Sequence, residues 1–313
     1  MAYAEAERID PGEIPVIALD GAASLDHVGR AILAAAEGIG FFYISDHGIP
    51  DTLMADVFRV ARAFFAEPVE RKRMVAPAGP HRGFIEMGGA KMASGARPDR
   101  KESFVWGLDE PGPDGIPANR WPAFPPETRD VLMTYFARGH TVGWTLMRAF
   151  AVAMGVAPDT FLRTVSRPVS RGSILYYPPQ PPEMGTEQFG VSEHTDYGVL
   201  TLLWQDDTGG LQVLGRDGRW LEAAPVPGTF VVNVGDLLAR WSNDRFRSTL
   251  HRVVNRSGRA RMSTALFIDP DRDTVIEPVA RDGEAPRYPA VTCGDYLRSR
   301  FDAAFAYRQK AGA

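Results

Sequence analysis

A series of short apolar segments in the second half of the chain constrains the fold more than any other feature. Turn-forming Gly, Asp, Pro and Asn residues separate these segments, which cover residues 173–177, 200–205, 211–214, 229–234, 249–255 and 261–268. Short strands with regular turn signals indicate a β-sandwich or a barrel, and the jelly roll is one such closed arrangement. We therefore predict a β core for this half of the chain.

The first half has a mixed pattern. Apolar spacing and strand-forming residues predict strands at 15–19 and 41–44 and amphipathic helices at 25–39 and 53–65. Residues 76–125 are rich in Gly, Pro and charge, with short strands near 82–86 and 102–106, as in a binding loop or lid. Apolar residues at helical spacing predict a long scaffold helix over 127–154. A second helix is predicted near 293–306, and we expect this one to pack on the outside of the barrel.

Composition narrows the class of protein. The 313 residues are 44% hydrophobic and 24% charged, which is typical of a globular enzyme-sized chain. A net charge of -4 argues against nucleic acid or an anionic membrane as partner and favours a small-molecule substrate. The single Cys293 and the absence of a signal-peptide pattern favour the cytoplasm. We expect a soluble monomer or small homo-oligomer.

The sharpest local feature is His194-Thr195-Asp196. On an extended strand, side chains two positions apart point to the same face, so His194 and Asp196 can bind one ion together. His251, on a second strand-like segment, offers a third ligand. Two histidines and one carboxylate leave coordination positions open, as in non-haem Fe(II) oxygenases, although zinc can use the same ligands.

A possible anion-binding pair follows the third histidine. The turn-like residues 255–259 predict a hairpin that folds the next strand back beside the strand of His251, bringing Arg261 and Ser263 near the metal. A planar guanidinium can hold a carboxylate through two bonds, with the serine hydroxyl as an additional donor. The alternative for Arg261 alone is an exposed hairpin arginine.

These elements, in this order, resemble the isopenicillin N synthase-like branch of the Fe(II)/2-oxoglutarate dioxygenases. The resemblance covers nearly the whole chain. It also includes residues 15–17, 40–50, 101–104, 176–179, 205–206 and 209–213.

The resemblance implies an α+β fold: a double-stranded β-helix (jelly roll) core with flanking helices and an α/β N-terminal region. Residues 1–125 would form the non-haem dioxygenase N-terminal region with a substrate loop. Residues 126–313 would form the scaffold helix and the Fe(II)/2-oxoglutarate core, within one compact unit.

The same resemblance implies the chemistry. Iron would be bound by His194, Asp196 and His251, and 2-oxoglutarate by Arg261, Ser263 and Tyr177. O2 would be the oxidant, and a C–H bond of a small organic molecule would be oxidised, most simply hydroxylated, with release of succinate and CO2. The iron centre would carry the reaction, with no separate protein acid or base.

For the substrate pocket the resemblance points to residues 81–104, the strand after the aspartate and the C-terminal helix. The candidate side chains are His81, Arg82, Phe104, Trp204 and Phe267. Aromatic lining would favour a partly apolar small molecule.

Two other functions share the same ligands. One is a non-haem iron oxidase of the isopenicillin N synthase type, which does not use 2-oxoglutarate. The other is a non-catalytic metal-binding jelly-roll protein, for example with zinc.

Overall fold

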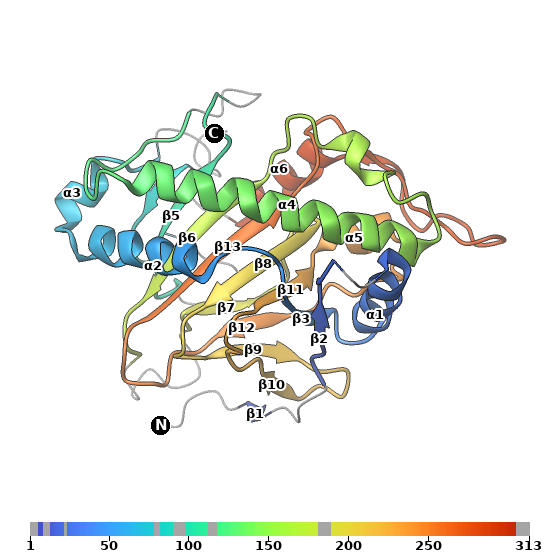
Figure 1. The fold of residues 1–313 in the computed structure, drawn as a ribbon, viewed down its shortest axis with the longest axis horizontal. Helices are drawn as coiled ribbons and strands as arrows, with labels where there is room; N and C mark the ends of the chain where they lie inside the picture. Colours follow the sequence, from blue (N-terminus) through green and yellow to red (C-terminus); the bar gives the residue numbers. More distant parts are fainter. Residues whose placement is uncertain are drawn as a thin grey trace.

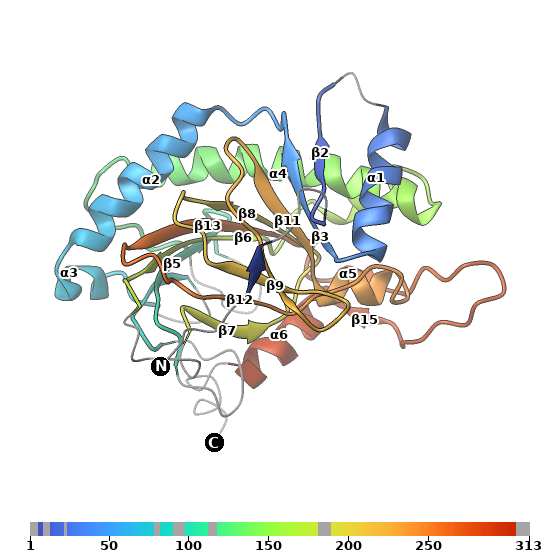
Figure 2. The ribbon, with the colours of Figure 1, turned by 90° about the horizontal axis from the view of Figure 1, so that it is seen from below.

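The structure, a computed structural model, describes residues 6–8, 13–21, 24–77, 82–89, 98–111, 118–180 and 189–304. Two β-sheets lie one above the other, and helices cover the outer face of the larger sheet (Figure 1). Figure 2 shows the resulting layers of helices, larger sheet and smaller sheet. The prediction of an α+β fold around a two-sheet core is confirmed.

The larger sheet combines strands from both halves of the chain. Its order is β2 (Val16–Ala18), β3 (Phe41–Ser45), β11 (Phe230–Val234), β8 (Leu200–Gln205), β13 (Arg261–Ile268), β6 (Arg171–Tyr177), β5 (Glu102–Gly107) and β4 (Gly83–Ile85). The neighbours are antiparallel except for β2 and β3. Strands from the first 125 residues therefore flank the later strands on both sides.

The smaller sheet faces the larger one. Its order is β1 (Glu7–Arg8), β10 (Trp220–Glu222), β9 (Leu211–Leu214), β12 (His251–Val253) and β7 (Val191–His194). A separate pair is formed by β14 (Val275–Ile276) and β15 (Val291–Thr292).

The predicted helices are present, and short ones are added. They are α1 (Leu25–Glu37), α2 (Asp51–Ala66), α3 (Val69–Arg73), α4 (Thr128–Met154), a 3-10 turn (Phe161–Thr164), α5 (Asp236–Trp241) and α6 (Cys293–Ala304). The long helix α4 crosses the outer face of the larger sheet (Figure 1). None of the helices in the described ranges is long and apolar enough to cross a membrane.

Alternation along β13 separates the core from the cavity between the sheets. Met262, Leu266 and Ile268 are buried in the main hydrophobic core on the side of α4. The alternate residues of the strand face the other way and line the cavity: Arg261, Ser263, Ala265 and Phe267. Because side chains alternate along a strand, one strand supplies both the core and the functional face.

The predicted hairpin after His251 is wrong. Strand β12 pairs with β7 and β9, whereas β13 pairs with β6 and β8, so the two strands lie in different sheets. The turn itself exists, because the Asn255 side-chain amide donates to the Arg259 carbonyl at 2.7 Å. It carries the chain from the smaller sheet to the larger one.

Candidate metal centre

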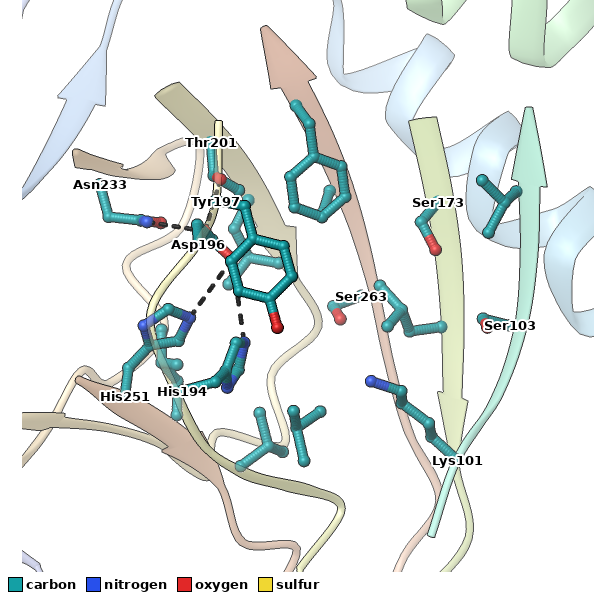
Figure 3. A pocket seen from close by; sticks show the side chains of 18 of the residues that line it. Lys101, Ser103, Ser173, His194, Asp196, Tyr197, Thr201, Asn233, His251 and Ser263 are labelled. Atoms are coloured by element: carbon teal, nitrogen blue, oxygen red, sulfur yellow. Dashed lines mark hydrogen bonds and ion pairs between the residues drawn. The ribbon is translucent and has the colours of Figure 1, made fainter. Parts of the chain in front are cut away.

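Three potential ligands converge at one end of the smaller sheet. His251 stands directly opposite His194 in the pairing of β12 with β7. Asp196 follows two residues after the end of β7, just beyond the strand on which we expected it. The Asp196 Oδ1 atom lies 3.8 Å from Nε2 of His194 and 3.9 Å from Nε2 of His251 (Figure 3). Ligand atoms of the three residues all lie within 4.8 Å of one another, so a single ion can contact all of them.

Backbone carbonyls fix the orientation of both imidazoles. Nδ1 of His194 lies 2.8 Å from the Ser192 carbonyl oxygen, and Nδ1 of His251 lies 3.1 Å from that of Thr249. A carbonyl only accepts, so each Nδ1 carries a proton, and Nε2 is the nitrogen of each ring that can offer a lone pair to a metal. Metal-binding histidines have this arrangement.

The carboxylate is fixed in a similar way. Oδ2 of Asp196 accepts hydrogen bonds from the Thr201 hydroxyl at 2.5 Å and from the Asn233 amide at 2.7 Å (Figure 3). Thr201 and Asn233 are register partners on neighbouring strands β8 and β11. Oδ1 therefore remains turned toward the two histidines.

Burial and neighbouring groups give His194 and Asp196 the charge states that binding of a cation requires. Desolvation, followed by the nearby His251, lowers the pKa of His194 to about 3, so its imidazole is neutral at physiological pH. Burial alone would raise the pKa of Asp196, but the two histidines and the two hydrogen bonds hold it below its usual range. The ligands are thus a neutral imidazole and an ionised carboxylate before any metal arrives.

A buried arginine lies in the same cavity. Arg261 is fully buried and donates to the Gly209 carbonyl at 2.7 Å, to Gln205 at 3.1 Å and to the Ser263 hydroxyl at 3.2 Å. Its guanidinium lies 4.8 Å from the ring centroid of Tyr177. In the part of the chain that is described, it has no carboxylate at ion-pair distance. Because an uncompensated buried charge is costly, this position suits an anionic ligand.

One cavity of about 160 Å³ contains all of these groups. It lies between the inner faces of the two sheets. The predicted metal and co-substrate residues that line it are His194, Asp196, His251, Arg261, Ser263 and Tyr177.

Of the candidates for the substrate pocket that are described, one lines the cavity and three do not. Phe267 lines the cavity, whereas Arg82, Phe104 and Trp204 lie outside its lining. Arg82 donates to backbone carbonyls of the following loop, and Trp204 packs against Phe230 on the other side of the sheet. His81 is outside the described residues.

The alternation of side chains along β5 and β8 explains why Phe104 and Trp204 lie outside the cavity lining. On β5 the cavity is lined by Ser103 and Val105, preceded by Lys101 just before the strand, so Phe104 points into the core behind the sheet. On β8 the cavity-facing residues are Thr201 and Leu203, with Trp204 on the opposite face. A one-residue error in register exchanges the two faces.

Other cavity residues escaped the sequence reading. They include Lys101, Arg171, Tyr197, Thr201, Asn233 and Phe301, the last from α6. The resemblance pointed to the C-terminal helix as part of the pocket lining, and Phe301 of α6 does line the cavity. Period-two alternation along β6 from the predicted Tyr177 leads to Arg171, which was the available signal for that residue. No local pattern identifies Phe301.

Comparisons with known proteins agree with this geometry. The sequence pattern of the 2OG-Fe(II) oxygenase superfamily matches residues 171–270, and that of the "non-haem dioxygenase in morphine synthesis N-terminal" matches residues 14–124. A homoarginine-6-hydroxylase from Oryza sativa subsp. japonica is 36% identical over 280 residues, covering 84% of this chain and 85% of its own. The 2-oxoglutarate-Fe(II) type oxidoreductase hxnY of Emericella nidulans is 34% identical, covering 95% of this chain and 88% of its own.

A solved structure extends the similarity to the fold. The crystal structure of a full-length Neurospora crassa protein in complex with alpha-KG and thymine matches with a TM-score of 0.84 and 33% identity. The match covers 93% of this chain and 96% of that one.

Proposed function

The chain belongs to the 2OG-Fe(II) oxygenase superfamily, and from this premise we propose that His194, Asp196 and His251 bind the iron and that Arg261 binds 2-oxoglutarate. The protein is an Fe(II)- and 2-oxoglutarate-dependent oxygenase that uses O2 and acts on a small molecule. Neither alternative, an oxidase without 2-oxoglutarate or a non-catalytic metal-binding protein, gains support from these relatives.

The ligand set supports the iron assignment. Two imidazole Nε2 atoms and one carboxylate oxygen face a common point, and no further His, Cys, Asp or Glu of the described residues joins this group. This 2-His-1-carboxylate arrangement is the one used by non-haem Fe(II) oxygenases. Backbone and side-chain hydrogen bonds hold all three ligands in place without a metal.

The observation that carries the co-substrate assignment is the buried, uncompensated charge of Arg261. Three acceptors within the protein already fix its guanidinium, so its plane is set before a ligand binds. We assign the distal carboxylate of 2-oxoglutarate to Arg261 and Ser263, with the Tyr177 ring packed against the arginine. The register pairing of Arg261 with Tyr177 keeps these groups together.

When bound, Fe(II) and 2-oxoglutarate supply the oxidising power that places oxygen from O2 on a C–H bond, with release of succinate and CO2. The chain's own groups bind and orient. Both sheets enclose the cavity with apolar side chains, which limits access of water to the reacting atoms. Hydroxylation is the outcome that we propose, as the name of the Oryza sativa relative indicates for that protein.

Anaerobic reconstitution with Fe(II), followed by titration with 2-oxoglutarate, tests the assignment through the visible charge-transfer band of the complex. Arg261→Ala should weaken 2-oxoglutarate binding roughly 10- to 150-fold, because a hydrogen bond to a charged group is worth about 1.5–3 kcal/mol. Arg148→Ala, at an exposed arginine of α4 paired with Asp159, is the control. Equal affinity of the Arg261 variant and wild type would refute this role.

A further inference from the structure

A second arginine in the cavity takes no part in the proposed binding of iron or co-substrate. Arg171, the first residue of β6, lines the same cavity and is partly buried. Its guanidinium carbon lies 4.4 Å from the ring centroid of Phe267 and 4.5 Å from that of Phe301. Stacking on aromatic rings leaves the N–H donors, which lie in the guanidinium plane, open to a ligand.

These donors have no partner among the described residues. Asp269 and Asp196 favour the charge of Arg171 from a distance, but neither forms an ion pair with it. The Asp269 carboxylate instead accepts from the Val199 backbone N–H at 2.9 Å, and Asp196 faces the two histidines. Burial lowers the pKa of Arg171, so a bound anion would offset an electrostatic cost.

The position of Arg171 excludes a role in holding the distal carboxylate of 2-oxoglutarate. In the pairing of β6 with β13, Arg171 stands opposite Phe267, whereas Arg261 stands opposite Tyr177. The Cα atoms of the two arginines therefore lie at opposite ends of the strand pair, roughly 20 Å apart at about 3.3 Å per residue. Each guanidinium stays at its own end, against Phe267 or Tyr177, so we assign the distal carboxylate of 2-oxoglutarate to Arg261 alone of the two.

The other cation of the cavity is compensated. The Lys101 ammonium lies 3.3 Å from the Asp99 carboxylate, whose other oxygen accepts from the Ser192 backbone N–H. Within the described ranges, Arg171 is thus the cation without an ion-pair partner on the side of the cavity away from Arg261. Next to it stand the rings of Phe301 and Tyr197, whose centroids are 5.7 Å apart, and Tyr197 directly follows Asp196.

We propose that Arg171 binds a carboxylate of the substrate and that the substrate is a small organic acid with an apolar or aromatic body. The guanidinium matches a carboxylate in shape and charge. Phe267 and Phe301 provide the apolar surface beside it, and the cavity of about 160 Å³ limits the size of the ligand. This inference rests on the proposed function, because it places the acid beside the proposed iron.

Matched pairs of acids and amides test the proposal. The Fe(II)- and 2-oxoglutarate-loaded enzyme is titrated anaerobically, by calorimetry, with phenylacetate and phenylacetamide, hexanoate and hexanamide, and cyclohexanecarboxylate and its amide. We expect at least one acid to bind ten times or more tightly than its amide. Arg171→Gln should abolish that preference, Arg171→Lys should keep part of it, and Arg148→Gln should leave it intact.

Two results would overturn the proposal: amides that bind as well as acids in every pair, or an acid preference that persists in Arg171→Gln. The acid preference of the wild type is itself a test if the variants fail to fold. The charge-transfer band separates this inference from the proposed function. If the wild type forms no band, the iron and 2-oxoglutarate assignment fails, and acid binding to the metal-free chain still tests Arg171.

Discussion

At the scale of single residues, the metal centre depends on side chains that do not face the metal. Thr201 and Asn233 hold one oxygen of Asp196, so that the other oxygen is turned toward His194 and His251. Without these bonds the carboxylate could rotate, and the two oxygens would compete for the same position. Removing a hydrogen-bond partner of a metal ligand typically weakens metal binding by about 10- to 100-fold.

Thr201→Val tests this role, because valine keeps the shape of the side chain and removes only the hydroxyl. We expect Mn(II), used as a stable substitute for Fe(II), to bind about tenfold or more weakly, as measured by paramagnetic resonance titration. Thr145→Val is the matched control, since its hydroxyl donates to the Thr141 carbonyl within α4, away from the metal centre. If both variants bind Mn(II) like the wild type, the hydroxyl does not position the ligand.

Sequence reading found the proposed ligands but not their supports. Arg261 and Ser263 are two residues apart on β13, so alternation brings them to one face. His194 and Asp196 have the same spacing, and they meet although Asp196 lies just beyond the end of β7. Thr201 and Asn233 meet only because β8 and β11 pair in one particular register. Such partners depend on tertiary pairing, which a single sequence does not encode locally.

At the scale of elements, helix α4 supports the strand that carries Arg261. A Cβ atom added at Gly143 would lie 2.8–3.1 Å from three side-chain atoms of Ile268. Ile268 is 2% exposed and β-branched, so it has little freedom to move away. Glycine therefore sets how closely the helix approaches the sheet.

Gly143→Ala should destabilise the protein although alanine is the better helix former. The gain in helix propensity is about 1 kcal/mol, while overpacking a core costs about 1–3 kcal/mol. We expect a net loss of up to about 2 kcal/mol in the free energy of unfolding, measured with urea. In an Ile268→Ala background the clash is removed, and Gly143→Ala should become neutral or stabilising. A destabilisation of equal size in both backgrounds would show that Ile268 is not the cause.

The limits of sequence reading at this scale concern strand pairing. Most helices and strands were predicted, since their apolar spacing is local. The hairpin between β12 and β13 was not correct, because a turn signal shows only that the chain reverses and not which strand it then joins. In a two-sheet core the next strand can enter the opposite sheet, which is what β13 does.

At the scale of the whole molecule, the helices and the larger sheet share the main hydrophobic cluster, and the strands of the two sheets share a second, smaller one. Polar groups buried in these clusters make stability depend on pH. His140 of α4 is 6% exposed and packs against Phe136 and Trp144, with ring centroids at 4.3 and 5.7 Å. Burial lowers its pKa to about 4, whereas an unfolded histidine has a pKa of about 6.5. Between these values the unfolded chain binds a proton that the folded chain does not.

The sign of the effect follows from proton linkage. The buried, neutral His140 contributes its full stabilisation above pH 6.5, and this stabilisation is lost as the pH falls toward 4. The free energy of unfolding then falls by no more than about 1.4 kcal/mol per pH unit. From pH 7.5 to pH 5, His140 should lower the free energy of unfolding of the metal-free protein by about 2 kcal/mol.

His140→Leu removes the titrating group and keeps an apolar side chain at this position. Its free energy of unfolding, measured with urea at pH 7.5, 6.5, 5.5 and 5, should fall less steeply than that of the wild type. Other histidines, including His194, titrate in both proteins, so the difference between the two curves isolates His140. Parallel curves would mean that His140 can take up its proton in the folded state, for example through water reaching the interface between α4 and the sheet.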